Sequence, residues 1–232
     1  MNELDAVECS LRDAAHARSA TLYSELETLV AIPTGRFHHD GLDAVRAILV
    51  ERLQAIGATT TLHAGAPRPD WLAGGVACSP PPTVVCAYAG NGSGPRILLA
   101  GHLDTVHDPE GDFDRLTLEE NGIARGPGAA DMKGGVLIAV TALELLAEQG
   151  VDCNWSFLFN SDEETGTFCS AEHLRAAARE HDVGLVMEPA LPDGSLVVER
   201  MGAGQFRIGK RQGGCAKGQE SRCRQTPRHA AQ

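Results

Sequence analysis

The sequence predicts an α/β fold in which a mostly parallel central sheet is flanked by helices. Two observations lead to this prediction. Between residues 83 and 187, short apolar runs suited to buried strands alternate with amphipathic helical segments. Several carboxylates and one histidine follow directly on these runs or open a helix. Strands joined through helices imply right-handed crossovers, so the carboxyl ends of the strands are expected to share one edge of the sheet.

Two helices and one strand are predicted ahead of the alternating region. Residues 11–31 carry apolar side chains at helical spacing and end before a proline. Asp40 can cap a second amphipathic helix, which Gly57 terminates. Residues 59–63 alternate as a strand does, and residues 65–82, rich in Pro and Gly, are expected to form an irregular loop.

The remaining predicted elements follow in chain order. Strands are predicted at residues 83–88, 96–100, 155–159 and 184–187, and helices at residues 131–148 and 171–179. The polar segment 106–121 is expected to contain an exposed hairpin. Two further strands, 195–199 and 205–208, are expected to begin a new unit.

Composition restricts the classes of function. The 232 residues suffice for one or two domains, with 43% hydrophobic and 22% charged residues. A net charge of −11 argues against a nucleic-acid partner, because phosphate binding needs concentrated Lys and Arg. No apolar run reaches membrane-spanning length, and the acidic N-terminus lacks a signal-peptide pattern, so no membrane partner is expected. Seven cysteines without a Cys-x-x-Cys pair predict neither a disulfide framework nor a zinc ribbon, and favour the reducing cytoplasm.

His102 and Asp104 form a His-x-Asp pair after the strand predicted at 96–100. Residues two apart on a strand point to the same side, so Asp104 can accept the proton of the imidazole nitrogen that does not bind metal. Taken alone, such a pair is more typical of a core histidine beside a surface aspartate.

Asp131 lies among glycines at the start of a predicted helix. An aspartate in this position usually caps the helix N-terminus. Gly134 and Gly135, however, each cost roughly 1 kcal/mol relative to Ala inside a helix. This cost predicts that backbone from another segment approaches closely here.

Acidic residues follow two of the predicted strands. They are Asp162, Glu163 and Glu164 after residues 155–159, and Glu188 after residues 184–187. Adjacent acids often form only a solvated turn, but at the carboxyl ends of parallel strands they face the crevice where α/β proteins bind ligands. With His102 and Asp131, these carboxylates predict one divalent-metal site. One imidazole with several carboxylates suits zinc, cobalt or manganese.

Four motifs resemble those of the zinc-dependent aminoacylase and carboxypeptidase family, which includes acetylornithine deacetylase, succinyl-diaminopimelate desuccinylase and carboxypeptidase G. They are Gly-His-Leu-Asp-Thr-Val at 101–106, Gly-Ala-Ala-Asp-Met-Lys-Gly-Gly at 128–135, the pair Glu163–Glu164, and Val-Met-Glu-Pro at 186–189. They occur in the order of the family, and the resemblance covers approximately residues 20–208.

The resemblance implies a role for each matching position. The implied metal ligands are His102, Asp131, Glu164 and Glu188, with Asp131 shared between two ions. The implied catalytic residues are Glu163, as the general base, and Asp104, beside the metal-binding imidazole. The implied cofactor is a pair of Zn²⁺ ions, with Co²⁺ or Mn²⁺ as substitutes. The peptide bond between Asp131 and Met132 is expected to be cis.

The implied reaction is hydrolysis of an amide or peptide bond by metal-activated water. The substrate is expected to be a small N-acyl amino acid or a peptide, which leaves a deacylase and a metallocarboxypeptidase as open alternatives. A homodimer is implied for the intact family. A non-catalytic metal-binding or interaction fragment of the same scaffold is the alternative function. Hydrolysis by Cys169 or Cys153 with His173 is disfavoured, because no strand-end elbow or oxyanion donor is evident.

The end of the chain departs from the resemblance. Residues 1–194 are assigned to the N-terminal part of the catalytic domain, and residues 195–208 to the start of a lid and dimerisation domain. Residues 209–232 contain no Val, Ile, Leu, Met, Phe, Trp or Tyr, and are expected to be a disordered basic tail that suggests a shifted reading frame. His229 lies in this tail, outside any matching motif. The catalytic domain is therefore expected to be incomplete at the C-terminus, and this chain to have little or no turnover.

Overall fold

The computed structural model describes residues 4–36, 38–69, 79–91, 94–120 and 122–199. Residues 1–198 form one compact unit. The predicted strand 205–208 and the predicted tail 209–232 lie outside the described residues.

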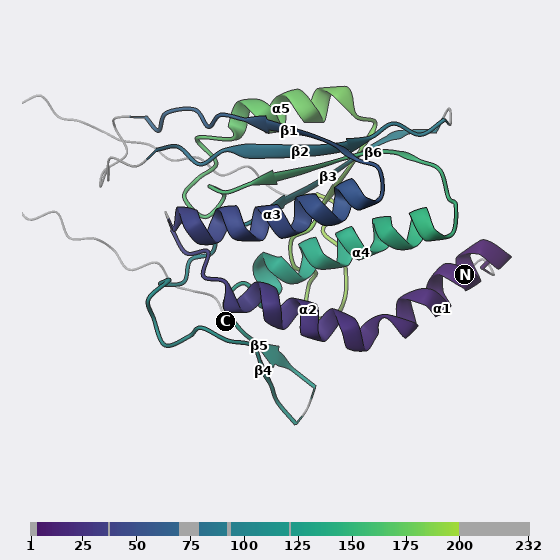
Figure 1. Ribbon diagram of the computed structural model, residues 1–232, viewed down its shortest axis with the longest axis horizontal. Coiled ribbons are helices and arrows are strands. Elements are labelled where there is room, and N and C mark those ends of the chain that lie inside the picture. The colour runs from purple at the N-terminus through teal and green to yellow at the C-terminus, as the bar shows by residue number, and fades with distance from the viewer. Residues whose placement is uncertain (1–3, 37, 70–78, 92–93, 121, 200–232) are drawn as a thin grey trace, which may run out of the picture. The chain divides into compact units, whose positions relative to one another are not determined.

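The elements follow one another largely as predicted (Figure 1). In chain order they are α1 (Ala6–Ala17), α2 (Ser19–Ala31), α3 (His39–Ala55), β1 (Thr59–His63), β2 (Thr83–Tyr88), β3 (Arg96–His102), β4 (Thr117–Leu118), β5 (Ala124–Arg125), a kinked turn (Ala129–Lys133), α4 (Gly134–Glu148), β6 (Asn154–Asn160), α5 (Ala171–Glu180) and β7 (Val183–Val186). None of the described helices has the length and apolar character needed to cross a membrane.

The sheet has five strands in the order β1-β2-β6-β3-β7. β3 pairs in parallel with both β6 and β7, whereas β2 pairs antiparallel with β1 and β6. Four strands therefore share one direction and β2 alone opposes them. The predicted sheet flanked by helices is confirmed.

The two crossovers explain which helix covers which face. The chain leaves β3, forms α4 and returns as β6 on one side of β3, and it then forms α5 and returns as β7 on the other side. Right-handed crossovers in opposite directions place their helices on opposite faces. Figure 1 shows this arrangement, with α5 on one face and α3 and α4 on the other. Since the chain leaves β3 and β6 toward opposite faces, their carboxyl ends flank the crevice where α/β proteins bind ligands.

The core lies mainly between the sheet and the helices α3 and α4. Phe157 and Phe159 of β6 point into it together with Leu49 and Val140, and all four are fully buried. Leu158, between the two phenylalanines, points to the opposite face, where it packs with residues of β3 and α5. β6 is thus buried on both faces, as a central strand requires.

Three predictions about local structure are corrected. The helix predicted at 11–31 is two helices, α1 and α2, and α1 begins early because Asp5 and Glu8 form a capping box. α3 is capped by the side chain of His38, which accepts from the N–H of Gly41, and Asp40 lies inside the helix. The exposed hairpin, predicted within 106–121, is formed by β4 and β5 and lies later in the chain.

The prediction of a strand at residues 195–199 is wrong. Apolar side chains at 196–198 suggested it, but these side chains are exposed and the segment pairs with no described strand. β7 is the last strand of the described residues and lies at an edge of the sheet, where Val183, Leu185 and Val186 are also exposed. Along its outer edge it pairs with no other strand of the described residues.

Candidate metal centre

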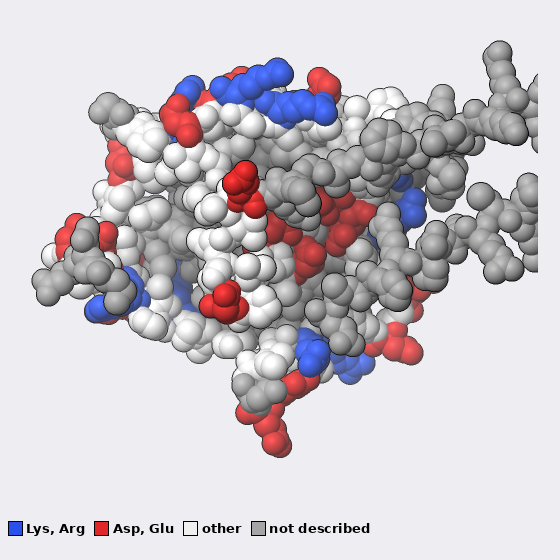
Figure 2. All heavy atoms as spheres, turned by 180° about the vertical axis from the view of Figure 1, so that it is seen from behind, with Lys and Arg blue, Asp and Glu red and all other residues white. Residues whose placement is uncertain are grey.

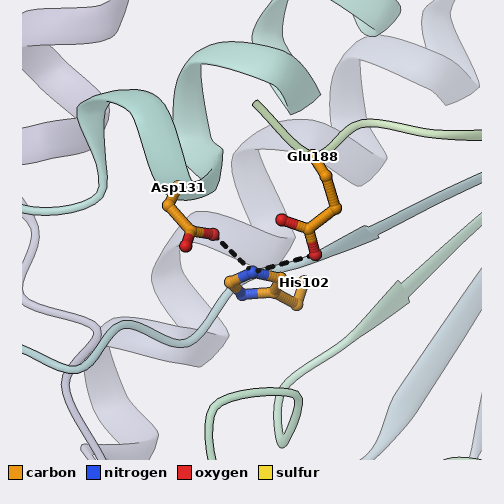
Figure 3. Close-up of side chains that lie close together, drawn as sticks. All are labelled: His102, Asp131 and Glu188. Atoms are coloured by element: carbon orange, nitrogen blue, oxygen red, sulfur yellow. Dashed lines mark hydrogen bonds and ion pairs between the residues drawn. The ribbon is translucent and has the colours of Figure 1, made fainter. Parts of the chain in front are cut away.

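His102 is the last residue of β3 and lies at the centre of the site (Figure 3). Its side chain is 2% exposed. Nε2 lies 2.9 Å from Oδ1 of Asp131, 3.8 Å from Oε1 of Glu188 and 4.0 Å from Oε2 of Glu163. These carboxylates come from three different loops, and all contact the same nitrogen.

Asp104 lies behind the imidazole and connects it to the Glu163–Glu164 pair. Nδ1 of His102 donates to the main-chain carbonyl of Asp104 at 2.8 Å, while the Asp104 carboxylate is farther away, at 3.5 Å. The nearer acceptor is therefore the carbonyl, which differs from the side-chain acceptor expected from the sequence. The carboxylate instead accepts the N–H of Glu163 at 3.2 Å and that of Glu164 at 2.9 Å. Because Nδ1 carries the donated proton, neutral His102 presents Nε2 as a lone pair to the carboxylates.

Asp131 does not cap a helix. It has extended backbone angles inside the kinked turn Ala129–Lys133, and the peptide bond to Met132 is cis, as the resemblance implied. Its side chain is 53% exposed and contacts His102. The helix that follows begins at Gly134 and has no side-chain cap.

The predicted close approach of backbone from another segment is confirmed at Gly135, whereas the backbone nearest to Gly134 belongs to the turn just before it. A Cβ atom on Gly134 would lie 2.4 Å from the carbonyl oxygen of Ala129, and one on Gly135 would lie 2.1 Å from that of Met187. Met187 immediately precedes Glu188. Gly135 thus allows the loop that carries Glu188 to pack against the first turn of α4.

Two sets of side chains can each hold a cation, and both include His102. One set is His102, Asp131 and Glu188, and the other is His102, Glu163 and Glu164; within each set the ligand atoms lie within 4.8 Å of one another. The side chains of Asp131, Glu163 and Glu188 are 53%, 45% and 37% exposed, so they surround the buried imidazole on its solvent side. Figure 2 shows Asp and Glu side chains gathered near the middle of the face opposite to that of Figure 1.

The charges in this cluster shift two pKa values. Burial disfavours the protonated form of His102, but the carboxylates of Asp104, Glu188 and Asp131 outweigh it and raise the pKa of the imidazole to about 9. Burial, together with the carboxylate of Asp131, raises the pKa of Glu164 to about 7. Carboxylates thus outweigh burial at His102 and add to its effect at Glu164, and a bound cation would offset their negative charge. The donor set of one imidazole and several carboxylate oxygens fits zinc, cobalt or manganese.

Asp162 is a functional-site residue that sequence reasoning did not separate from its acidic neighbours. Its buried carboxylate accepts the N–H of Cys169 at 2.6 Å, the N–H of Ser170 at 3.3 Å and the hydroxyl of Ser170 at 2.6 Å. These bonds close the turn that carries Glu163 and Glu164. Its place directly after a buried strand was the only signal that it turns inward.

The cysteine-nucleophile alternative gains no support. Cys153 lies just before β6, at the end of that strand opposite to Glu163. Nε2 of His173 lies 3.0 Å from the carbonyl of Ala64, which leaves that nitrogen unavailable as a base for a thiol, and the ring stacks on His63.

Comparison with solved structures supports the fold. Human carnosine dipeptidase 1 superposes with a TM-score of 0.66 at 21% identity, over 78% of this chain and 41% of that one. A metallo-carboxypeptidase of the M20 family from Sulfolobus solfataricus superposes with a TM-score of 0.58 at 19% identity, over 75% of this chain and 38% of that one.

Comparison with protein sequences identifies the family. Carboxypeptidase G2 of Pseudomonas sp. (strain RS-16) is 33% identical over 182 residues, which are 77% of this chain and 41% of the relative. A succinyl-diaminopimelate desuccinylase of Methylobacterium nodulans is 39% identical over 129 residues, 48% of this chain and 31% of the relative. The chain thus spans less than half the length of these relatives. Residues 98–216, just over half of the chain, match the model of peptidase family M20/M25/M40. Together with the motifs around His102, this match shows that the chain belongs to peptidase family M20/M25/M40.

Proposed function

We propose that this chain carries a dinuclear metal centre that hydrolyses amide or peptide bonds. The observation that supports it is the convergence of two carboxylate sets on the buried imidazole of His102. In this proposal His102 and Glu188 hold one ion, Glu164 holds the other, and Asp131 is shared. Bound together, two divalent cations polarise the scissile carbonyl and lower the pKa of the attacking water.

Glu163 is the proposed general base. Its carboxylate is half exposed and lies on the solvent side of His102, where a water and a substrate can reach it. Its main-chain N–H is held by Asp104, so its place relative to the imidazole is fixed by a buried group. It takes a proton from the attacking water and delivers it to the leaving amine.

The proposed substrates are N-acyl amino acids and short peptides. The names of the relatives, a carboxypeptidase and a desuccinylase, both describe cleavage of an amide bond next to an amino acid. We also propose residues 1–194 as the catalytic portion, residues 195–208 as the start of a lid, the cytoplasm as the compartment, and a homodimer for the intact protein.

A non-catalytic metal-binding fragment is the second candidate. It is favoured by the two carboxylate sets around His102, which can hold a cation whether or not turnover follows. Both candidates require the metal, so turnover separates them.

One experiment tests both candidates. Bound Zn²⁺ or Co²⁺ is measured in the 232-residue chain and in His102→Asn and His173→Asn variants, together with hydrolysis of N-succinyl and N-acetyl amino acids and dipeptides. We expect the chain and the His173→Asn control to bind metal and His102→Asn to lose it. Binding without turnover supports the fragment and agrees with the low activity expected from the sequence. Equal binding by His102→Asn contradicts the proposed centre.

A further inference from the structure

Hydrogen bonds join the end of helix α2 to the turn that carries Asp131 and to the loop that follows His102. The side chain of Lys133, from the turn that carries Asp131, donates to the carbonyl of Leu29 at 2.9 Å and to that of Ile32 at 2.7 Å. The N–H of Thr105, from the loop after β3, donates to the carbonyl of Thr34 at 3.0 Å. A single short segment, residues 29–34, thus receives hydrogen bonds from the turn that carries Asp131 and from the loop that follows His102.

Burying the side chain of Lys133 costs free energy, which its hydrogen bonds must offset. Its side chain is 2% exposed, and taking an ammonium group out of water carries a large penalty unless its hydrogens are bonded. A linear apolar side chain such as Met would fill the same space without that penalty. What the amine adds is a charge-assisted bond to two carbonyls at the end of α2, where helix carbonyls lack partners within the helix.

Close packing around residues 29–34 restricts independent movement of this segment. A Cβ atom on Gly126 would lie 2.7 Å from Cγ1 of Val30, and one on Gly35 would lie 2.1 Å from the carbonyl oxygen of His107. The segment therefore packs tightly against the strands that lead into the Asp131 turn and against the loop that follows His102. A displacement at the end of α2 is transmitted to both loops.

We propose that Lys133 is a positioning residue for the metal ligand Asp131, and that it makes the end of α2 part of the support of the metal centre. This inference rests on the proposed metal centre. Lys133 acts through the main chain: it fixes the turn Ala129–Lys133 against the carbonyls of Leu29 and Ile32, so that the Asp131 carboxylate stays directed at His102.

The first test compares Lys133→Met with Arg18→Met. Arg18 also attaches the N-terminal helices, but through ion pairs with Glu144 and Glu148 of α4, so its loss weakens the same helices without touching the metal-binding loops. Affinity for Co²⁺ alone is measured by calorimetry, and the visible absorption of bound Co²⁺ reports the geometry of its ligands. We expect Lys133→Met to weaken Co²⁺ binding at least tenfold and to alter the absorption, the usual effect of removing a group that orients a ligand, and Arg18→Met to stay within twofold of the parent.

A second measurement uses the unmodified chain, so it holds even if Lys133→Met does not fold. Amide hydrogen exchange is followed with and without Zn²⁺. We expect the segment 29–34 to gain protection together with residues 102–105 and 129–133, while α1 is unchanged. Protection of residues 129–133 without residues 29–34, or parent-like Co²⁺ binding by folded Lys133→Met, overturns the inference and leaves the metal centre intact. A parent chain that binds no metal overturns both.

Discussion

The affinity of the site for metal is expected to rise steeply with pH below about 9. A cation binds the neutral imidazole of His102, so it must displace the proton that the surrounding carboxylates stabilise. With the pKa of His102 at about 9, each unit of pH below that value weakens binding about tenfold, or ~1.4 kcal/mol. Between pH 8 and pH 6 the affinity is therefore expected to fall about 100-fold from this residue alone.

Calorimetry can count the displaced protons directly. Zn²⁺ is titrated at pH 7 into metal-free chain in two buffers that differ in ionisation enthalpy. About one proton from His102 is expected, plus a fraction of a proton from Glu164, whose pKa is raised to about 7. The variant His173→Gln removes a histidine remote from the site and should release the same number. Zero proton release at pH 7, or an affinity that is flat between pH 6 and 8, would refute the reasoning.

The same shift predicts the opposite trend for the stability of the metal-free chain. The pKa of His102 is higher in the folded state, at about 9, than the ordinary value of 6.5. Its contribution is therefore fully present below pH 6.5 and is lost as pH rises through 9, an order-of-magnitude change of about 3 kcal/mol. Denaturant unfolding of metal-free chain at pH 6.5 and pH 9.5 measures it. Equal stabilities at the two pH values would contradict the assigned electrostatics.

Three substitutions test separate parts of the site. Glu163→Gln should leave metal affinity within a few-fold but lower any measurable turnover by roughly 10²–10⁴, so unchanged kcat would exclude it as the base. Gly135→Ala should destabilise by about 1–3 kcal/mol in denaturant unfolding, since its Cβ would lie 2.1 Å from the Met187 carbonyl oxygen, whereas Gly94→Ala, which meets no atom within 4 Å, should be near neutral. Asp162→Asn should cost about 2–4 kcal/mol, measured in the same way, and a neutral result would contradict its role in closing the turn.

The inner strands β2, β3 and β6 could be predicted because they are short apolar runs that are buried on one or both faces. β1 and β2 have the predicted bounds, and β3 and β6 extend only slightly beyond theirs. The errors fall where local pattern and tertiary context disagree. Residues 195–199 have apolar side chains, but a strand also needs a partner, and pairing is a property of the whole fold. The opposed direction of β2 depends likewise on the path of a loop that composition does not specify.

The clustering of Asp131, Glu163 and Glu188 around His102 could be predicted because most of these residues follow strand ends, but the groups that hold them in place could not. Asp162 belongs to a run of three acids, and nothing in the run distinguishes the inward carboxylate from the two outward ones. The carbonyl of Asp104, the nearer partner of His102, is invisible in any sequence because every residue has one. Lys133 belongs to the motif at residues 128–135, yet it bonds to main-chain carbonyls at the end of α2, about a hundred residues earlier in the chain.

The carboxylates around His102 are partly exposed, whereas the groups that hold them in place are buried. This difference decides what a substitution at each position costs. Asp131, Glu163 and Glu188 are more than one third exposed, so replacing one of them removes a metal contact or a base, and replacing Asp131 also removes the carboxylate that lies 2.9 Å from Nε2 of the buried His102. Asp104 and Lys133 are nearly fully buried and hydrogen-bonded, so replacing either exposes main-chain partners to an apolar surrounding and costs stability as well as affinity. Burial and the carboxylate of Asp131 raise the pKa of Glu164, while the protonated imidazole of His102 offsets part of the repulsion among the carboxylates in the metal-free fold. Asp131→Asn should therefore weaken metal binding and also remove part of the stability that protonated His102 gives the metal-free chain, a loss expected at pH 6.5 and largely absent at pH 9.5. An equal loss of stability at both pH values with unchanged metal affinity would show that Asp131 is a structural residue and not a ligand.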